Sequence, residues 1–199
     1  MKKKKLKFQV KLNGKKIKTC VFISGAGSNL RSLINCSRDY NFPIKIALII
    51  SNKANAKGLL IAKKYHIKHK FISSLDKKKF ERNCLMELKK NQIKFLCLAG
   101  FMKVLSKNFI NSFRYKIINI HPSLLPKYKG LNTHKRVLKN KEIYSGCTVH
   151  YVTTSLDSGK IIAKKKILID KNETEKSLGI KVLNQEHILY PQSIISIFK

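Results

Sequence analysis

The stretch I-N-I-H-P-S-L-L-P, residues 118–126, contains two polar side chains that could carry out proton chemistry. Asn119 and His121 lie two positions apart at the end of a predicted strand, so both side chains face the same side of the sheet. A histidine exchanges protons near neutral pH, and an asparagine amide can donate to a developing oxyanion. Pro122 ends the strand directly after the histidine. A structural histidine held by a loop carbonyl is the alternative, but the Asn-x-His pair before a rigid loop favours catalysis.

A carboxylate partner for His121 occurs in the turn S-L-D-S-G-K, residues 155–160. Asp157 is one of four aspartates in the chain, and the other three are predicted at the ends of helices and strands. We expect Asp157 to lie beside His121, to raise the imidazole pKa above its reference of ~6.5, and to keep the ring charged as an acid. The alternative is simple turn chemistry, because Asp-Ser-Gly is a favourable turn sequence.

A glycine-rich segment, S-G-A-G-S-N-L over residues 24–30, could bind a phosphate group. Gly25 and Gly27 permit a tight turn, and Ser28 and Asn29 then open a helix whose first N–H groups have no partners within the helix. A valine at position 27 is expected to fill the space of the phosphate. The segment lacks the third glycine of a dinucleotide-binding turn and the Gly-Lys-Ser/Thr of a Walker loop, which disfavours NAD and ATP. An ordinary turn with an asparagine cap is the alternative.

A third segment, L-A-G-F-M-K-V-L-S over residues 98–106, leaves a predicted buried strand through Gly100. It exposes Phe101, Met102 and Lys103 at the end of that strand. An aromatic and methionine rim of this kind could receive a flat ligand ring, and packing of the same side chains under a loop is an equally good interpretation.

The elements that must position these residues alternate between strand and helix. Apolar runs predict strands at 19–24, 44–50, 70–72, 95–99, 116–120, 147–153 and 161–169, and one-sided apolar spacing predicts helices at 29–38, 56–65, 75–91, 106–113, 133–140 and 173–198. This alternation indicates an α/β fold with a largely parallel sheet covered on both faces, with the last two strands antiparallel to each other. Ligands in such sheets bind beyond the carboxyl ends of the strands, which points to the loops after residues 24, 50, 99, 120 and 153.

The chain divides into a lysine-rich extension, residues 1–17, and one domain, residues 18–199. Residues 6–12 alternate apolar and polar side chains before Asn13-Gly14, which predicts a β-hairpin arm that leads into the first core strand. A disordered lysine tail over residues 1–16 is the alternative. The five cysteines form no CxxC pair, and no apolar run approaches ~18 residues. These features predict reduced thiols, no metal, no membrane span and a cytoplasmic location.

The net charge of +33 comes from 43 Lys and Arg residues against 10 Asp and Glu residues. A nucleic-acid-binding protein is one interpretation of this excess. However, only five of the basic residues are arginines, and the lysines are spread along the whole chain together with many Ile and Asn residues. We therefore favour a compositional bias, with no specific nucleic-acid partner. The charge would still attract an anionic small substrate.

Six segments together resemble those of phosphoribosylglycinamide formyltransferases, the folate-dependent enzymes of purine synthesis. From about residue 18 to the C-terminus they read, in the order of that family, S-G-A-G-S-N-L, S-N-K-A-N-A-K-G-L, L-A-G-F-M-K-V-L-S, I-N-I-H-P-S-L-L-P-K-Y-K-G-L-N-T-H, L-D-S-G and Q-E-H-I-L-Y-P. The resemblance implies a single α/β domain with a mainly parallel, Rossmann-like sheet of seven strands. It implies formyl transfer from the cosubstrate 10-formyltetrahydrofolate to the amine of 5′-phosphoribosylglycinamide, by a monomer or homodimer that needs no metal.

Carried over by position, the resemblance also implies site residues. The catalytic residues would be Asn119, His121 and Asp157, with Asn119 stabilising the oxyanion, charged His121 protonating the leaving folate nitrogen, and Asp157 orienting His121 and a water. Substrate binding would involve Gly27, Ser28 and Asn29 at the phosphate, and Gln185 and Glu186 at the glycinamide end. Folate contacts would be Lys78, Met102, Lys103, Val104, Leu105, Asn119, Thr153, Thr154, Ser155, Leu156 and Asp157.

Two related enzymes of one-carbon metabolism are the nearest alternatives. Formyltetrahydrofolate deformylase, in which water replaces the amine, resembles this chain around Asn119 and His121 but usually has a second histidine at the position of Pro122 and an N-terminal regulatory domain. Methionyl-tRNA formyltransferase would require a further C-terminal domain. The sequence favours the phosphoribosylglycinamide enzyme over both.

Overall fold

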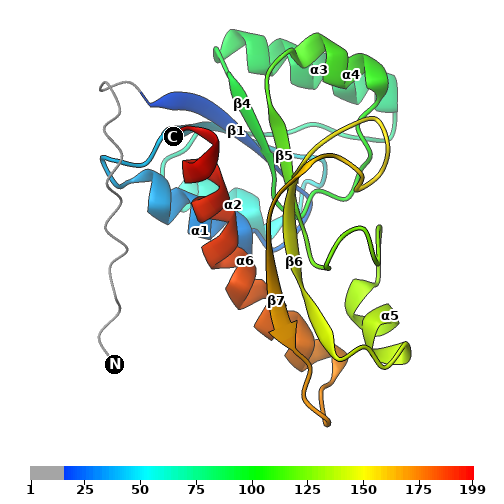
Figure 1. The fold of residues 1–199 in the computed structure, drawn as a ribbon. Coiled ribbons are helices and arrows are strands. Elements are labelled where there is room, and N and C mark those ends of the chain that lie inside the picture. The colour runs from blue at the N-terminus through cyan, green and yellow to red at the C-terminus, as the bar shows by residue number, and fades with distance from the viewer. Residues whose placement is uncertain (1–15) are drawn as a thin grey trace.

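A seven-stranded sheet forms the centre of the computed structural model, which describes residues 16–199 (Figure 1). The strands are β1 (Ile17–Ile23), β2 (Ile44–Ser51), β3 (His69–Phe71), β4 (Phe95–Leu98), β5 (Ile117–His121), β6 (Tyr144–Tyr151) and β7 (Ile161–Leu168). Their order across the sheet is β3-β2-β1-β4-β5-β6-β7. β1 to β5 run parallel, and β6 is antiparallel to both β5 and β7. The predicted α/β fold with a mainly parallel sheet is therefore confirmed.

Helices cover both faces of the sheet, as the apolar strands require. They are α1 (Ser28–Ser37), α2 (Lys57–Lys64), α3 (Lys77–Lys90), α4 (Lys107–Phe113), α5 (Thr133–Lys139) and α6 (Glu175–Ile197). One core is formed with α1, α2, α5 and α6, and includes Leu33 and Tyr190. The other is formed with α3 and α4, and includes Phe80 and Phe109. Figure 1 shows α3 and α4 on one side of the sheet and α1, α2 and α6 on the other.

Local sequence explains where these helices begin and which face they bury. Leu30, Leu33 and Ile34 recur at helical spacing, and all three are buried against the sheet. The side chain of Asp76, one of the aspartates predicted at the end of an element, accepts a hydrogen bond from the backbone N–H of Lys79 at 3.0 Å and so caps the start of α3. Ser106 and Thr174 cap α4 and α6 in the same way.

The predicted N-terminal hairpin arm and lysine tail lie outside the described residues. The first core strand that should follow the arm is present as β1, and it begins at Ile17. Among residues 16–199, no helix is both long enough and apolar enough to cross a membrane.

Candidate active site

The loops that follow β1, β4 and β5, the β6–β7 loop and one side of α6 line a cleft of about 660 Å³. Asn119, His121 and Asp157 line this cleft. The glycine-rich segment reaches it as well, through residues 25–29. The two groups that the sequence singled out for proton chemistry and for phosphate binding therefore share one cavity.

His121 ends β5 and lies between two hydrogen-bond acceptors. Its Nδ1 is 3.3 Å from Asp157 Oδ2, and the two side chains are 7% and 8% exposed. Its Nε2 is 2.9 Å from the backbone carbonyl oxygen of Tyr128. Because a carbonyl and an ionised carboxylate both only accept, each ring nitrogen has a partner to which it can donate, and a doubly protonated ring would satisfy both. The predicted pairing of His121 with Asp157 is present.

The loop after β5 holds the Tyr128 carbonyl in place. Thr148 on β6 is fully buried, and its hydroxyl donates to the carbonyl of Ser123 at 2.7 Å and accepts from the N–H of Leu125 at 3.1 Å. The Tyr128 hydroxyl donates to Glu142 at 2.8 Å. These contacts fix the loop at three points, so the ring of His121 has a defined orientation.

The charge of His121 differs from the sequence-based prediction. Burial lowers its pKa, and the Tyr128 carbonyl and the Asp157 carboxylate oppose that effect without overcoming it. Asp157 acts in the predicted direction, but the expectation that the pKa exceeds ~6.5 is wrong, because desolvation of the ring is the larger effect. Burial also raises the pKa of Asp157, yet His150, the Gly130 N–H and His121 together bring it below its usual value. The free site thus favours a neutral imidazole beside a charged carboxylate.

Sequence reasoning missed His150, which completes this group. The antiparallel register pairs His150 on β6 with Asn119 on β5, and Asn119 Nδ2 is 3.3 Å from His150 Nε2. The same Nε2 is 3.6 Å from Asp157 Oδ1, while Nδ1 donates to the Tyr151 carbonyl at 2.9 Å. A histidine within the apolar strand C-T-V-H-Y-V, residues 147–152, was the available signal. His150 links the amide of Asn119 to the carboxylate of Asp157.

The start of α1 has the backbone geometry on which the phosphate-binding prediction depends. Gly27, however, is required for a different reason than expected. Helix α1 begins at Ser28, and Gly27 has a φ of 76°, which favours glycine. A Cβ built at Gly27 would lie 2.7 Å from the Cα of Gly58 in α2. Valine at position 27 would therefore collide with α2, which corrects the expectation that it would simply fill the phosphate space. Gly25 has no atom within 4 Å of its Cβ position, so it is the glycine that borders open space.

Glu186 joins α6 to the glycine-rich segment. Its Oε2 accepts a hydrogen bond from Asn29 Nδ2 at 2.6 Å, and the residue is 5% exposed. Burial raises the pKa of this carboxyl to about 7, while the bond from Asn29 opposes the shift. Asn29 Oδ1 is buried and has no hydrogen-bond partner among the described residues. A ligand could therefore donate to the Glu186 carboxyl, which gains or loses its charge near neutral pH, and to Asn29 Oδ1, which is free.

Most of the predicted folate contacts line the same cleft. Met102, Lys103, Val104 and Leu105 form one wall, and the β6–β7 loop contributes Thr153, Ser155, Leu156 and Asp157. Three predicted residues do not line it, namely Thr154, Gln185 and Lys78. Lys78 lies on α3 in a separate groove beside α4. Residues 130–134, to which the sequence analysis assigned no role, also line the cleft.

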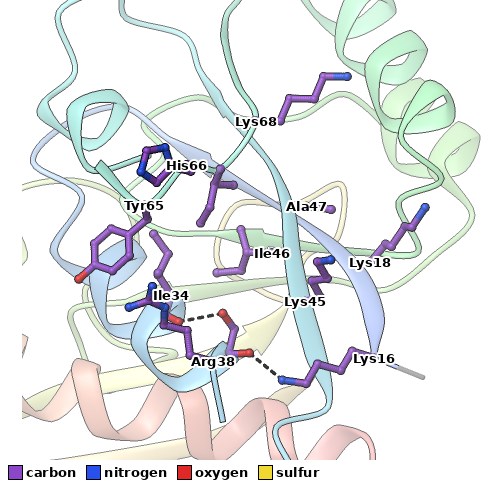
Figure 2. Close-up of a pocket in the computed structure, with 12 residues that line it drawn as sticks. Lys16, Lys18, Ile34, Arg38, Lys45, Ile46, Ala47, Tyr65, His66 and Lys68 are labelled. Carbon is purple, nitrogen blue, oxygen red and sulfur yellow. Dashed lines mark hydrogen bonds between the residues drawn. The ribbon is translucent and has the colours of Figure 1, made fainter. Parts of the chain in front are cut away.

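A second hollow, of about 570 Å³, lies near the amino ends of β1 and β2 and shares no residue with the cleft (Figure 2). Lys16 Nζ donates to the carbonyls of Ser37 and Asp39 at the end of α1. Lys18 and Lys68 donate to amide oxygens just beyond the end of α3. Lys16 therefore caps the end of α1, and Lys18 and Lys68 hold side chains of the turn that follows α3. In the part of the chain that the structure covers, no three His, Cys, Asp or Glu side chains gather as metal ligands.

Comparison with known proteins places this geometry in a family. The formyl transferase family pattern matches residues 17–194. A phosphoribosylglycinamide formyltransferase of Haemophilus influenzae is 38% identical over 180 residues, which cover 87% of this chain and 84% of that protein. The crystal structure of phosphoribosylglycinamide formyltransferase from Bacillus halodurans superposes with a TM-score of 0.88 at 30% identity, covering 92% of this chain and 95% of that one.

A longer relative matches over a small part of its length. The trifunctional purine biosynthetic protein adenosine-3 of Chironomus tentans is 40% identical over 179 residues, which cover 87% of this chain but 13% of that protein. This chain spans 13–19% of the length of that protein and of five further trifunctional relatives of the same name. Since the family pattern extends over nearly all of the described residues, this protein belongs to the formyl transferase family.

Proposed function

We propose that this protein is a phosphoribosylglycinamide formyltransferase, which moves the formyl group of 10-formyltetrahydrofolate to the amine of 5′-phosphoribosylglycinamide in purine biosynthesis. The observation that carries the proposal is the single cleft that joins Asn119, His121 and Asp157 to the glycine-rich start of α1. Membership of the formyl transferase family and the names of full-length relatives support it.

The proposed binding mode follows from which groups line the cleft. The phosphate accepts hydrogen bonds from the N–H groups of Ser28 and Asn29, since the first turn of a helix leaves its N–H groups free. Glu186 accepts from the glycinamide end of the same substrate. The folate lies against Met102 to Leu105 on one side and the β6–β7 loop on the other. The reacting amine and formyl group then meet beside His121.

The proposed chemistry is direct transfer without a covalent enzyme intermediate. The amine nitrogen attacks the formyl carbon, the new C–N bond forms, and the carbonyl oxygen becomes an oxyanion. Asn119 donates a hydrogen bond to that oxyanion. The developing negative charge raises the pKa of His121, which takes the proton of the attacking amine through a water held by Asp157, while Asp157 stabilises the imidazolium. The oxyanion then returns to a carbonyl as the bond to the folate nitrogen breaks, and His121 gives that same proton to the folate nitrogen.

The test is turnover with purified protein and both substrates. Absorbance that follows the folate product should increase only when 5′-phosphoribosylglycinamide is present. Product release from 10-formyltetrahydrofolate alone, at an equal rate, would instead indicate the hydrolytic deformylase. No folate product under either condition would contradict the proposal.

A further inference from the structure

The cleft segment, residues 101–106, connects β4 to α4 and forms the wall assigned to the folate. It has no regular secondary structure up to the N-cap of α4 at Ser106. Met102 and Val104 are 60% and 48% exposed, so side-chain packing at these two positions contributes little to its conformation. Its conformation therefore depends on Phe101 and the buried Leu105, which pack in the core beneath α3 and α4, and on the hydrogen bonds at its two ends.

The C-terminal end of the cleft segment is held by a buried carboxylate on α3. Glu81 is 8% exposed, and its Oε1 accepts from the backbone N–H of Ser106 at 2.7 Å. Its Oε2 accepts from the Ser106 hydroxyl at 2.5 Å. The same hydroxyl accepts from the N–H of Phe109 at 3.1 Å, so one serine joins Glu81 to the first turn of α4. Hydrogen bonds to a charged acceptor are stronger than neutral ones, particularly when buried.

The N-terminal end is held from two directions. The Ser24 hydroxyl accepts from the N–H of Met102 at 2.9 Å and donates to Asn52 at 2.6 Å. The ring of Phe80, the residue before Glu81, stacks on Phe101 with centroids 6.0 Å apart. Adjacent residues of α3 thus contact both ends of the cleft segment, and Figure 1 shows α3 beside α4 on this face of the sheet.

We propose that Glu81 is a positioning residue that sets the shape of the folate wall through Ser106, without touching either substrate. It lines the groove beside α4 and not the cleft, so its effect must pass through the cleft segment. This inference rests on the proposed function only in naming folate as the ligand of that wall. Loss of the two hydrogen bonds between Glu81 and Ser106 should weaken folate binding. It should leave the conformation of the glycine-rich segment unchanged, because that segment lies between β1 and α1.

The test compares Glu81→Gln with Glu87→Gln, a control on the same helix. Glutamine keeps the size of Glu81 and can still pair with Ser106, because a hydroxyl also accepts hydrogen bonds, but it removes the negative charge that strengthens both contacts. Glu87 pairs with Lys70 on β3 at 2.6 Å, so its substitution removes the same charge away from the cleft segment. Glu81→Gln should raise the folate KM about tenfold, the size expected when two hydrogen bonds lose their charged acceptor, and leave the KM of the phosphoribosyl substrate within about twofold. Glu81→Asp, which keeps the negative charge, should restore part of the loss.

Amide hydrogen exchange of the ligand-free protein gives a second readout that needs no turnover. Glu81→Gln should speed exchange in residues 101–106 and leave residues 28–37 unchanged, and Glu87→Gln should alter neither segment. If Glu81→Gln does not fold, Ser106→Ala tests the same pair from the other side. Equal changes in both KM values, or unaltered exchange in the cleft segment, would overturn the inference. If exchange becomes faster only in residues 101–106 and the unaltered protein shows no formyl transfer, the role of Glu81 in holding this segment is supported and the proposed function is refuted.

Discussion

The buried carboxyl of Glu186 makes the stability of this protein depend on pH in a calculable way. Burial raises its pKa from 4.5 to about 7 in the folded state. Because the folded pKa exceeds the unfolded value, the native state binds this proton more tightly. The resulting stabilisation is fully present below pH 4.5 and is lost as pH rises through 7. The shift corresponds to about 3 kcal/mol, and most of it falls between pH 5 and 8.

The substitution Glu186→Gln isolates this contribution. Glutamine retains an oxygen that can accept from Asn29 but never ionises, so other titrating groups cancel when the two proteins are compared. We expect similar free energies of unfolding at pH 5, and at pH 8 an advantage of about 2 kcal/mol for the glutamine variant. Urea unfolding at pH 5, 6, 7 and 8 measures the difference. A difference that stays constant across this range would refute the assignment of a raised pKa.

The same carboxyl should report substrate binding. An amine that donates to Glu186 favours the ionised form, so binding lowers its pKa and releases a proton when the free group is protonated. Calorimetric titration with 5′-phosphoribosylglycinamide at pH 6, in two buffers of different ionisation enthalpy, counts the protons. Glu186→Gln should reduce the difference between buffers by the protons that Glu186 releases, while the substrate phosphate, whose second pKa is ~6, contributes equally in both proteins. Equal proton release in the variant would show that another group titrates.

Three further outcomes are expected. His121→Ala and Asp157→Asn should each lower kcat by ~10²–10⁴-fold, the usual range for general acid–base catalysis, while circular dichroism shows an intact fold; turnover near that of the unaltered protein would contradict their roles. Gly25→Val should raise the KM of the phosphoribosyl substrate without lowering Tm, whereas Gly27→Val should lower Tm because its Cβ meets Gly58. In the ligand-free protein, NMR titration should place the His121 pKa below 6.5, and Asp157→Asn should lower it further, because that carboxylate opposes burial; an increase would refute the pairing.

The fold was largely predictable because its elements bury apolar side chains in simple patterns. The run I-K-I-A-L-I-I-S forms β2 as expected, and helix α1 spans Ser28–Ser37 where the spacing predicts 29–38. A buried strand between two helices has few alternatives in a parallel sheet. The glycine-rich turn before α1 was predictable for a similar reason, because Gly27 has a local backbone requirement that the sequence displays directly.

The neighbours of the catalytic candidates were less predictable, because they depend on strand direction and register. Alternation identifies β6 as a strand but does not specify that it runs antiparallel to β5 with Asn119 opposite His150. That direction also brings the end of β6 beside the start of β5, since Ile118 pairs with Tyr151. The loop that carries Asp157 must therefore fold back to reach His121. The apolar periodicity of the strands gives no information on the path of the loop between them.

Protonation states were the hardest to predict, since they depend on burial that only the assembled cleft provides. Burial lowers the pKa of His121 and of His134, and it raises the pKa of Glu186, so all three groups are shifted toward their neutral forms. Asp157 is the exception, because His150, the Gly130 N–H and His121 together outweigh its desolvation. A cleft with one fixed negative charge and several nearly neutral acids and bases responds strongly to charge brought by a ligand. The charge that develops during the proposed formyl transfer can therefore determine where the protons reside.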